Sequence, residues 1–292
     1  MLDSPEIRYK QRKLMGTGVS YASALSQAME DLHPSLASVF SNPNDTLGVE
    51  YCRALDKLAS NIQPYCVTRV GANHDCNSPS EVGLPVSASY IRLLLHQCNG
   101  EDELESLRSY MPTNSFEVLR NHITTLCAPA DISRLDRAII MKLRTMSVEE
   151  LSQLPDVSEG LENRIGECAS FGGADVGFSS LADNIKCKRY THARIRRILL
   201  SALLGIASDD SIGTPPYIRV LAMNHRGKEI LSAASSCGKL PIVTRYSQLA
   251  SLDDRSKRIF SLCAAANDIH GLTLPIVPPS GRDYTQKLIV EK

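Results

Sequence analysis

The sequence predicts an α/β protein whose first part holds helices and a strand, whose middle part is mainly helical, and whose last part is a small α/β region. Three observations lead to this order. Residues 62–70 (IQPYCVTRV) are rich in the residue types that suit a strand. From Ser115 onward, apolar side chains recur at helical spacing, and beyond Gly213 the pattern returns to strand-like runs on either side of a helical one.

The composition limits the class of protein. The chain has 292 residues, 43% of them hydrophobic, which is enough for a sizeable core and for two domains. Its 32 basic and 32 acidic residues balance, so any binding to nucleic acid must come from a local patch rather than from the whole surface. No apolar run reaches membrane-spanning length, and the polar start MLDSPEIRYKQRK is unlike a secretory signal. We therefore expect a cytoplasmic protein without membrane contact.

The cysteines and histidines do not predict a metal site. The nine cysteines are scattered, with no C-x-x-C pair and no Cys/His cluster at zinc spacing. We expect reduced and mostly buried thiols. His74, Asp75 and Cys76 are three potential ligands in a row, but adjacent side chains cannot easily turn towards one ion, so we expect a polar loop there.

The first part begins with helical sequence. Residues 5–32 show helical spacing with a break near Gly16 and Gly18. Residues 40–48 (FSNPNDTLG) collect turn and cap residues, which predicts a turn, and residues 49–58 then predict a helix.

A strand, a long loop and a helix come next, an order that can create a phosphate site. Ser87 can cap a helix that begins near Ala88, and the amino end of a helix carries free N–H groups and a partial positive charge. Arg92 lies in the first turns of that helix, and Arg69 ends the strand, where ligands collect in open parallel sheets. The alternative for Ser87 and Arg92 is plain helix capping beside a surface charge, which is the more common arrangement.

The middle part is expected to begin after Pro112, at the turn-forming segment PTNS, which gives domains 1–112 and 113–292. Helix then follows helix with short connections, and we find no repeat of fixed period. The helical runs are FEVLRNHITTLC, SRLDRAIIMKLRTM, VEELSQL and EGLENRIGECA.

The stretch at 186–197 (KCKRYTHARIRR) holds six basic residues and no Asp or Glu, whereas a solvated helix face normally mixes signs. Thr191 can cap a helix whose apolar stripe faces inward, so that the cations lie on its outer and flanking faces and on the turn before it. The stripe consists of Ile195, Ile198, Leu199, Ala202 and Leu203, and the cations are Lys186, Lys188, Arg189, Arg194, Arg196 and Arg197.

Two interpretations of these cations remain open. They can bind the phosphates of a nucleic acid, where each neutralised phosphate adds affinity through released counterions, while Tyr190 stacks on a base. They can instead pair with carboxylates of another element, such as those in residues 253–257, or fix one helix on the next.

The last part predicts a small parallel sheet. Residues 215–224 and 240–246 suit strands, and residues 225–235 suit a helix between them, so the two strands are expected to pair in parallel. The polar tail from Pro278 (PPSGRDYTQKLIVEK) is expected to lie at the periphery.

Six blocks of the sequence resemble, in order and spacing, the bacterial tRNA(Met) cytidine acetate ligase family. The blocks are PNDTLGVEYCRAL, VTRVGANHD, SASYIR, EGLENRI, KCKRYTHARIRRILLSALL and PPYIRVLAMNHRGKEIL. The resemblance implies a partial Rossmann-like nucleotidyltransferase domain at 1–112, followed by a helical RNA-binding domain with a small β-containing C-terminal part at 113–292. It also implies an enzyme that uses ATP to activate acetate as acetyl-adenylate. The acetyl group then passes to the wobble cytidine of elongator tRNA(Met), which forms N4-acetylcytidine.

The same resemblance suggests roles for individual residues. Asn44 and Arg69 match family positions that contact ATP, and Ser87 and Arg92 match an S-x-x-x-I-R element placed near phosphates. The basic stretch at 186–197 matches a block that we interpret as facing tRNA. ATP, acetate and tRNA are thus the expected partners, Mg²⁺ is expected with ATP, and no residue is assigned to catalysis.

One departure from the family pattern affects the expected activity. The family opens with a strand and a nucleotide-binding loop that carries H-x-G-H, and this sequence contains no H-x-G-H. We therefore expect the chain to lack the front of the nucleotidyltransferase domain and to be incomplete for catalysis. A non-catalytic tRNA-binding protein, or a protein that docks an acidic partner, is the alternative.

Overall fold

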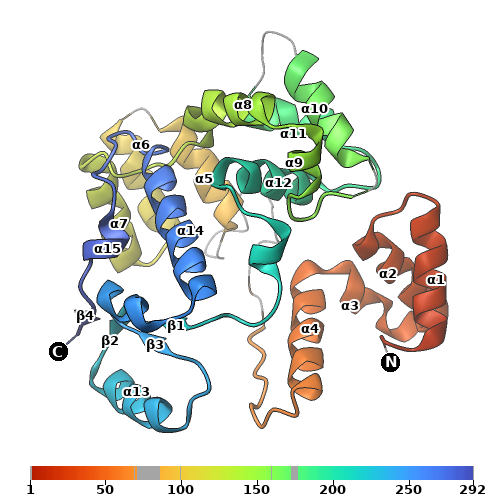
Figure 1. Cartoon of the computed structure of the whole chain (residues 1–292), viewed down its shortest axis with the longest axis horizontal. Coiled ribbons are helices and arrows are strands. Elements are labelled where there is room, and N and C mark those ends of the chain that lie inside the picture. Colours follow the sequence, from red (N-terminus) through yellow and green to blue (C-terminus); the bar gives the residue numbers. More distant parts are fainter. Residues whose placement is uncertain are drawn as a thin grey trace. The chain divides into compact units, whose positions relative to one another are not determined.

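The computed structural model describes residues 2–68, 70, 86–98, 100–158, 160–171 and 177–291, and within them helices and two small parallel sheets confirm the predicted α/β class (Figure 1). The chain forms two compact units. The first is Met1–Thr125 with Cys187–Thr191, and the second is Leu126–Lys186 with His192–Lys292. This division falls after Thr125, and the domain boundary expected at Pro112 stays a prediction.

The first two helices have the predicted break between them. Helix α1 spans Pro5–Gly16 and helix α2 spans Tyr21–Leu32. Gly18 has φ +89°, in the left-handed region that glycine adopts without steric cost, so the chain can turn there. Ser20 then caps α2 by accepting a hydrogen bond from the N–H of Ser23.

The turn predicted at 40–48 is wrong, because this segment belongs to helices. Helix α3 spans Ala37–Ser41 and helix α4 spans Pro43–Lys57, with Asn42 between them. Proline is compatible with the start of a helix because the first helical N–H groups need no partner within the helix. The helix predicted from residue 49 therefore begins six residues earlier, at Pro43.

The strand predicted at 62–70 is also wrong for the part that the structure describes, since residues 61–68 and Val70 have no regular secondary structure. Tyr65 is 90% exposed and Val67 is 85% exposed, so these side chains have no sheet or core to pack on. Strand-forming residues are stabilised mainly by cross-strand neighbours, and none is present for them here. Arg69 and the loop with His74, Asp75 and Cys76 lie outside the described residues.

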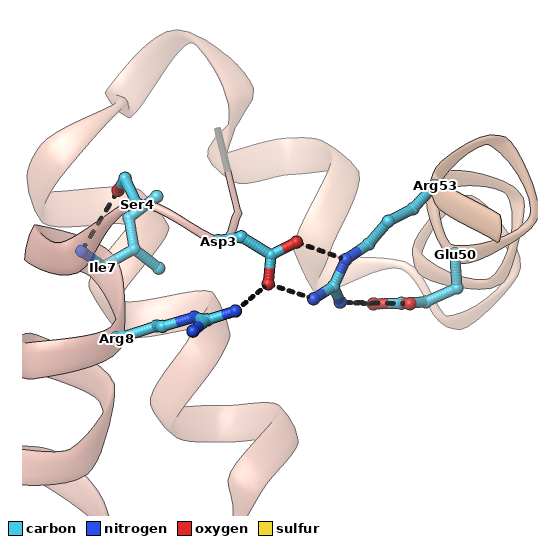
Figure 2. A network of polar contacts seen from close by, with 6 residues as sticks. All are labelled: Asp3, Ser4, Ile7, Arg8, Glu50 and Arg53. Atoms are coloured by element: carbon cyan, nitrogen blue, oxygen red, sulfur yellow. Dashed lines mark hydrogen bonds and ion pairs between the residues drawn. The ribbon is translucent and has the colours of Figure 1, made fainter. Parts of the chain in front are cut away.

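A polar network ties the start of the chain to α4 (Figure 2). The Asp3 carboxylate accepts hydrogen bonds from the guanidiniums of Arg8 and Arg53, with Arg53 Nε at 2.9 Å from Asp3 Oδ2. Arg53 also donates to Glu50 Oε1 at 3.1 Å. The hydrogen bond from Arg53, and then that from Arg8, hold the pKa of Asp3 far below its ordinary value.

The remaining helices of the first unit surround a small core of their own. Phe116, Leu104 and Leu107 are buried there, and the Arg108 guanidinium lies 4.4 Å from the centre of the Phe116 ring. The elements are α5 (Ala88–Gln97), α6 (Glu101–Ser106), the 3-10 helix η2 (Leu107–Tyr110) and α7 (Thr113–Thr124).

The second unit contains three of the four predicted helical runs and the helix predicted after Thr191, while the first run, FEVLRNHITTLC, is α7 of the first unit. The predicted elements are η3 (Ile132–Leu135) with α8 (Asp136–Thr145), α9 (Val148–Ser152), α10 (Leu161–Phe171) and α12 (His192–Leu204). The elements not predicted from the sequence are α11 (Phe178–Ile185), η4 (Ser208–Ser211), η5 (Tyr246–Ser251) and α14 (Asp254–Gly271). Ser147 and Glu150 form a reciprocal capping box at the start of α9, which satisfies two backbone N–H groups.

The parallel pair predicted in the last part is confirmed. Strand β1 (Ile218–Arg219) pairs in parallel with β3 (Ile242–Val243), and α13 (His225–Cys237) lies between them in sequence. The strand expected over 215–224 is divided, because β2 (Ala222–Met223) pairs instead with β4 (Ile289–Val290) of a second sheet.

The tail from Pro278 lies mostly at the surface, as predicted, but it is anchored at one buried residue. Besides β4 it contains α15 (Arg282–Thr285), where Asp283 is buried and pairs with the Arg219 guanidinium of β1. A polar tail can therefore be fixed to the core by one ion pair and two backbone pairings.

The expected burial of the thiols is wrong for most described cysteines. All eight of these are free, and Cys52, Cys66, Cys127, Cys237 and Cys263 are exposed. Among the described residues no His, Cys, Asp or Glu cluster is arranged to hold a metal ion. Within the same ranges, no helix is both long and apolar enough to cross a membrane.

The Asp3 network predicts an acid-sensitive first unit. Because the pKa of Asp3 is lower in the folded chain than its ordinary value of 3.8, the stabilisation is present above that value and is lost as the pH falls through the folded pKa. We expect Asp3→Asn to lower the urea midpoint at neutral pH and to reduce its further fall at about pH 2. Asp56→Asn, at an exposed carboxylate of α4, is the matched control. Equal acid sensitivity of the wild-type and Asp3→Asn chains would contradict this role.

Candidate nucleic-acid interface

Burial of one apolar stripe fixes the orientation of α12. Ile195, Ile198, Leu199 and Ala202 are all fully buried, as the helical spacing predicts, and α12 packs against α8 and α11. Leu203, the fifth predicted member, is half-buried. Because the stripe cannot rotate into solvent without losing this packing, the basic residues between its members must lie on the flanking and outer faces.

The segment that leads into α12 is held by its backbone. Arg164 of α10 donates to the carbonyl oxygens of Ile185 at 2.6 Å and Asn184 at 2.7 Å, which satisfies the end of α11. A turn follows in which the N–H of Tyr190 donates to the Cys187 carbonyl at 3.2 Å. These backbone contacts hold the end of α11 and the turn that follows it.

Arg194 serves to fix a neighbouring loop. Its Nε and Nη2 donate to the Asp156 carbonyl at 2.9 and 2.6 Å, and Nη2 also donates to Ser158 Oγ at 3.0 Å. Asp156 has φ +66°, a conformation that non-glycine residues rarely adopt, so the loop between α9 and α10 depends on such contacts to hold its shape.

Arg197 pairs with the carboxylate of the same residue. Its Nη2 and Nε lie 2.9 and 3.2 Å from Asp156 Oδ2, in a pair of which both members are well exposed. The carboxylate interpretation of the basic stretch is therefore correct for Arg197, whereas Arg194 fixes a loop and not one helix on the next. The predicted source of the carboxylate is wrong, since Asp253 caps α14 through the N–H of Ser256 and Asp254 lies 3.7 Å from Lys257.

The other cations of the stretch remain at the surface. Lys186, Lys188 and Arg196 are exposed, and no ion pair with a described carboxylate is found for any of them. Arg189 is also exposed but has an interaction of its own. Tyr190 is only 7% exposed, so its ring has little surface on which a base could stack, contrary to the prediction.

The residues expected near ATP are placed only in part. Asn44 lies exposed in the first turn of α4. Ser87 is buried and caps α5 by accepting from the N–H of Tyr90 at 3.0 Å, so the capping interpretation is confirmed for its hydroxyl. Arg92 is exposed, and its Nη2 donates to Ser89 Oγ at 3.2 Å. Contact of these residues, and of Arg69, with ATP stays a prediction.

Asp156 is the residue that the sequence does not reveal. It lies in a loop thirty-eight residues before Arg194, and nothing in the motif LPDVSEG marks it as the partner of two arginines. The only local sign is its place in a turn-forming segment, where Asp tolerates the left-handed conformation.

Comparison with known proteins identifies relatives over nearly the whole chain. The model of the HIGH Nucleotidyl Transferase family matches residues 2–282. A tRNA(Met) cytidine acetate ligase of Acetivibrio thermocellus is 29% identical over 99% of this chain and 72% of the relative. The protein of the same name from Thermoanaerobacter pseudethanolicus is 31% identical over 99% of this chain and 70% of the relative.

Solved structures give the same relationship. The apo crystal structure of Thermotoga maritima TmcAL superposes with a TM-score of 0.85 at 25% identity, over 99% of this chain and 71% of that one. A second structure of Thermotoga maritima TmcAL, bound with alpha-thio ATP, superposes with a TM-score of 0.82 at 24% identity and the same coverage. The α/β fold of this chain is thus that of TmcAL.

The two arginines that contact Asp156 are expected to differ in their importance for stability. Arg194→Ala should lower the free energy of unfolding by about 1–2 kcal/mol, because it removes three hydrogen bonds, two of them to a backbone carbonyl. Arg197→Ala removes an exposed pair and should cost less than about 0.5 kcal/mol. Urea unfolding measures both. Equal losses, or a larger loss for Arg197→Ala, would show that the Arg194 contacts do not stabilise the loop.

Proposed function

We propose that this chain acts as an ATP-dependent ligase on elongator tRNA(Met). It belongs to the HIGH nucleotidyltransferase family and, within that family, to the tRNA(Met) cytidine acetate ligases. Acetate attacks the α-phosphorus of ATP, which forms acetyl-adenylate and releases pyrophosphate. The exocyclic amine of the wobble cytidine then attacks the acetyl carbonyl, AMP leaves, and the amine loses one proton. The product is N4-acetylcytidine.

The observation that supports tRNA as the substrate is the set of exposed cations without carboxylate partners in the stretch 186–197. In this stretch Lys186, Lys188 and Arg196 are exposed, and Asp156 takes up only Arg194 and Arg197. A local group of cations attracts a polyanion even when the whole chain is neutral, since neighbouring charges act within about 10 Å at moderate salt. Each cation that reaches a phosphate adds affinity through counterion release.

Residues of the first unit are proposed to bind the nucleotide. Asn44 and Arg69 would contact ATP, with Ser87 and Arg92 near its phosphates and Mg²⁺ bound together with ATP. A relative with this fold has been crystallised with alpha-thio ATP. For Ser87 the proposed contact requires the hydroxyl to keep its cap with Tyr90 while it donates its proton to an oxygen of the phosphate.

The activation of acetate needs groups that stabilise charge on the α-phosphate. The sequence holds no H-x-G-H element, and we propose that activation depends on such an element in addition to the residues named above. A non-catalytic tRNA-binding protein is the second candidate, since it would need the exposed cations but not that element. Either protein would act in the cytoplasm, where tRNA is modified.

Acetate-dependent conversion of ATP to AMP in the presence of elongator tRNA(Met), measured with this chain joined to a segment that carries the H-x-G-H element, separates the two candidates. The ligase should form AMP and N4-acetylcytidine together, both measured by chromatography of the digested tRNA and the nucleotides. Tight tRNA binding without acetate-dependent AMP would instead establish the non-catalytic protein.

Removal of the exposed cations should weaken tRNA binding. We expect the triple variant Lys186→Gln, Lys188→Gln, Arg196→Gln to bind elongator tRNA(Met) at least roughly tenfold more weakly at low salt, because up to three phosphate contacts are lost. The matched control removes three exposed cations around α13 instead, in Arg226→Gln, Lys228→Gln, Lys239→Gln. Filter binding measures both affinities. Equal losses of tRNA affinity in the two triple variants would show that the basic stretch contributes only its charge and is not a specific tRNA site.

A further inference from the structure

Three aromatic rings form a cluster in the second unit, and none of them belongs to the basic stretch at 186–197. The Tyr246 ring lies 4.8 Å from the Tyr284 ring and 5.5 Å from the Phe260 ring, measured between ring centres. Phe260 is buried, whereas Tyr246 is 48% and Tyr284 is 38% exposed. Two rings with open surface thus rest on a buried third one.

The cluster is held rigidly by polar contacts behind it. The Arg219 guanidinium of β1 lies 4.9 Å from the centre of the Phe260 ring and pairs with the buried carboxylate of Asp283, the residue before Tyr284. The N–H of Gly281 donates to Asp268 Oδ1 at 2.9 Å, which fixes the start of α15 on α14. These contacts hold Tyr284 against Phe260 before any ligand binds, so little conformational entropy would be lost on binding.

A cavity of about 200 Å³ opens beside Tyr246, between η5 and the first turns of α14. Its walls are mainly apolar, from Tyr246, Leu249 and Phe260. Ser247, Ser261 and Lys257 are the residues with polar side chains in its lining. Lys257 is half-exposed and lies 3.7 Å from Asp254, a loose pair at the surface that a phosphate can displace.

A flat apolar wall, a few hydrogen-bonding groups and a nearby cation match the chemistry of an unpaired nucleotide. Aromatic rings bind bases of any sequence because every base has a π-face, and single-stranded nucleic-acid sites combine such rings with cations for the backbone. In tRNA the bases that proteins stack on are those of loops and ends, where they are not paired. A small apolar metabolite would offer no negative group for the Lys257 ammonium.

We propose that this cavity binds one unpaired nucleobase of the RNA substrate, stacked on Tyr246, with the adjoining phosphate near Lys257. The inference rests on the proposed function only in that tRNA supplies the nucleobase. It assigns to the second unit a contact with bases, which the buried Tyr190 ring is unable to make.

The absence of tryptophan from the chain permits a direct test. Tyr246→Trp keeps a stacking ring and introduces the single tryptophan of the chain, whose emission is excited separately from that of the tyrosines. We expect mixed-sequence single-stranded RNA to quench its emission, because the base covers the indole, and we expect inorganic polyphosphate to leave it unchanged. Tyr9→Trp, at an exposed tyrosine of α1, is the control and should respond to neither probe. Bound RNA that leaves the Tyr246→Trp emission unchanged, or equal quenching by polyphosphate, overturns the proposal.

Affinity variants distinguish failure of the cavity proposal from failure of the proposed function. Tyr246→Leu should weaken binding of elongator tRNA(Met) about tenfold, while Tyr246→Phe, which keeps the ring and its packing on Phe260, should bind like the wild type. If Tyr246→Leu binds tRNA normally while removal of the cations at 186, 188 and 196 weakens binding, the cavity proposal alone fails. If the wild-type chain binds tRNA no more tightly than it binds polyphosphate, the proposed function fails.

Discussion

Burial of the apolar stripe of α12 is the constraint on which the functional account depends. Ile195, Ile198, Leu199 and Ala202 lie in the core, so the helix has only one orientation that keeps them there. The positions of the cations follow from that orientation. Arg194 and Arg197 both reach Asp156, whereas Arg196 projects into solvent. The basic stretch is therefore divided between structure and surface, and only its surface members have charge available for a phosphate.

This division would allow a chain with zero net charge to bind an RNA as proposed. Arg194 uses its directional donors on a loop whose backbone is held in a left-handed conformation at Asp156, a role that lysine could not fill with a single ammonium. Lysines 186 and 188 make no such contact with the loop. The aromatic cluster at Tyr246 offers a different kind of contact, since stacking distinguishes unpaired bases from the backbone charge that every RNA shares. Charge and stacking together would favour an RNA with unpaired bases over a plain polyanion.

Local rules predicted what depends on local sequence. The break at Gly18, the cap at Ser87, the stripe of α12 and the parallel pairing of β1 with β3 all follow from residue type and spacing. What failed or was missed depends on distant partners. Residues 62–68 have strand-forming types but no neighbouring strand, and the polar tail is fixed through Asp283 to an arginine sixty-four residues away. Likewise, no spacing rule connects Asp156 with Arg194 and Arg197, and the two rings around Phe260 come from segments that only the fold brings together.

The salt dependence of tRNA binding tests the division of the cations most directly. The slope of log affinity against log salt counts the phosphates that a protein neutralises, at about 0.7–0.9 per contact. Arg196→Gln is predicted to reduce this slope by roughly one contact, because Arg196 is free to reach a phosphate. Arg197→Gln should change it much less, because Asp156 already neutralises that guanidinium. Equal changes in slope for the two variants, or a larger change for Arg197→Gln, would contradict the account.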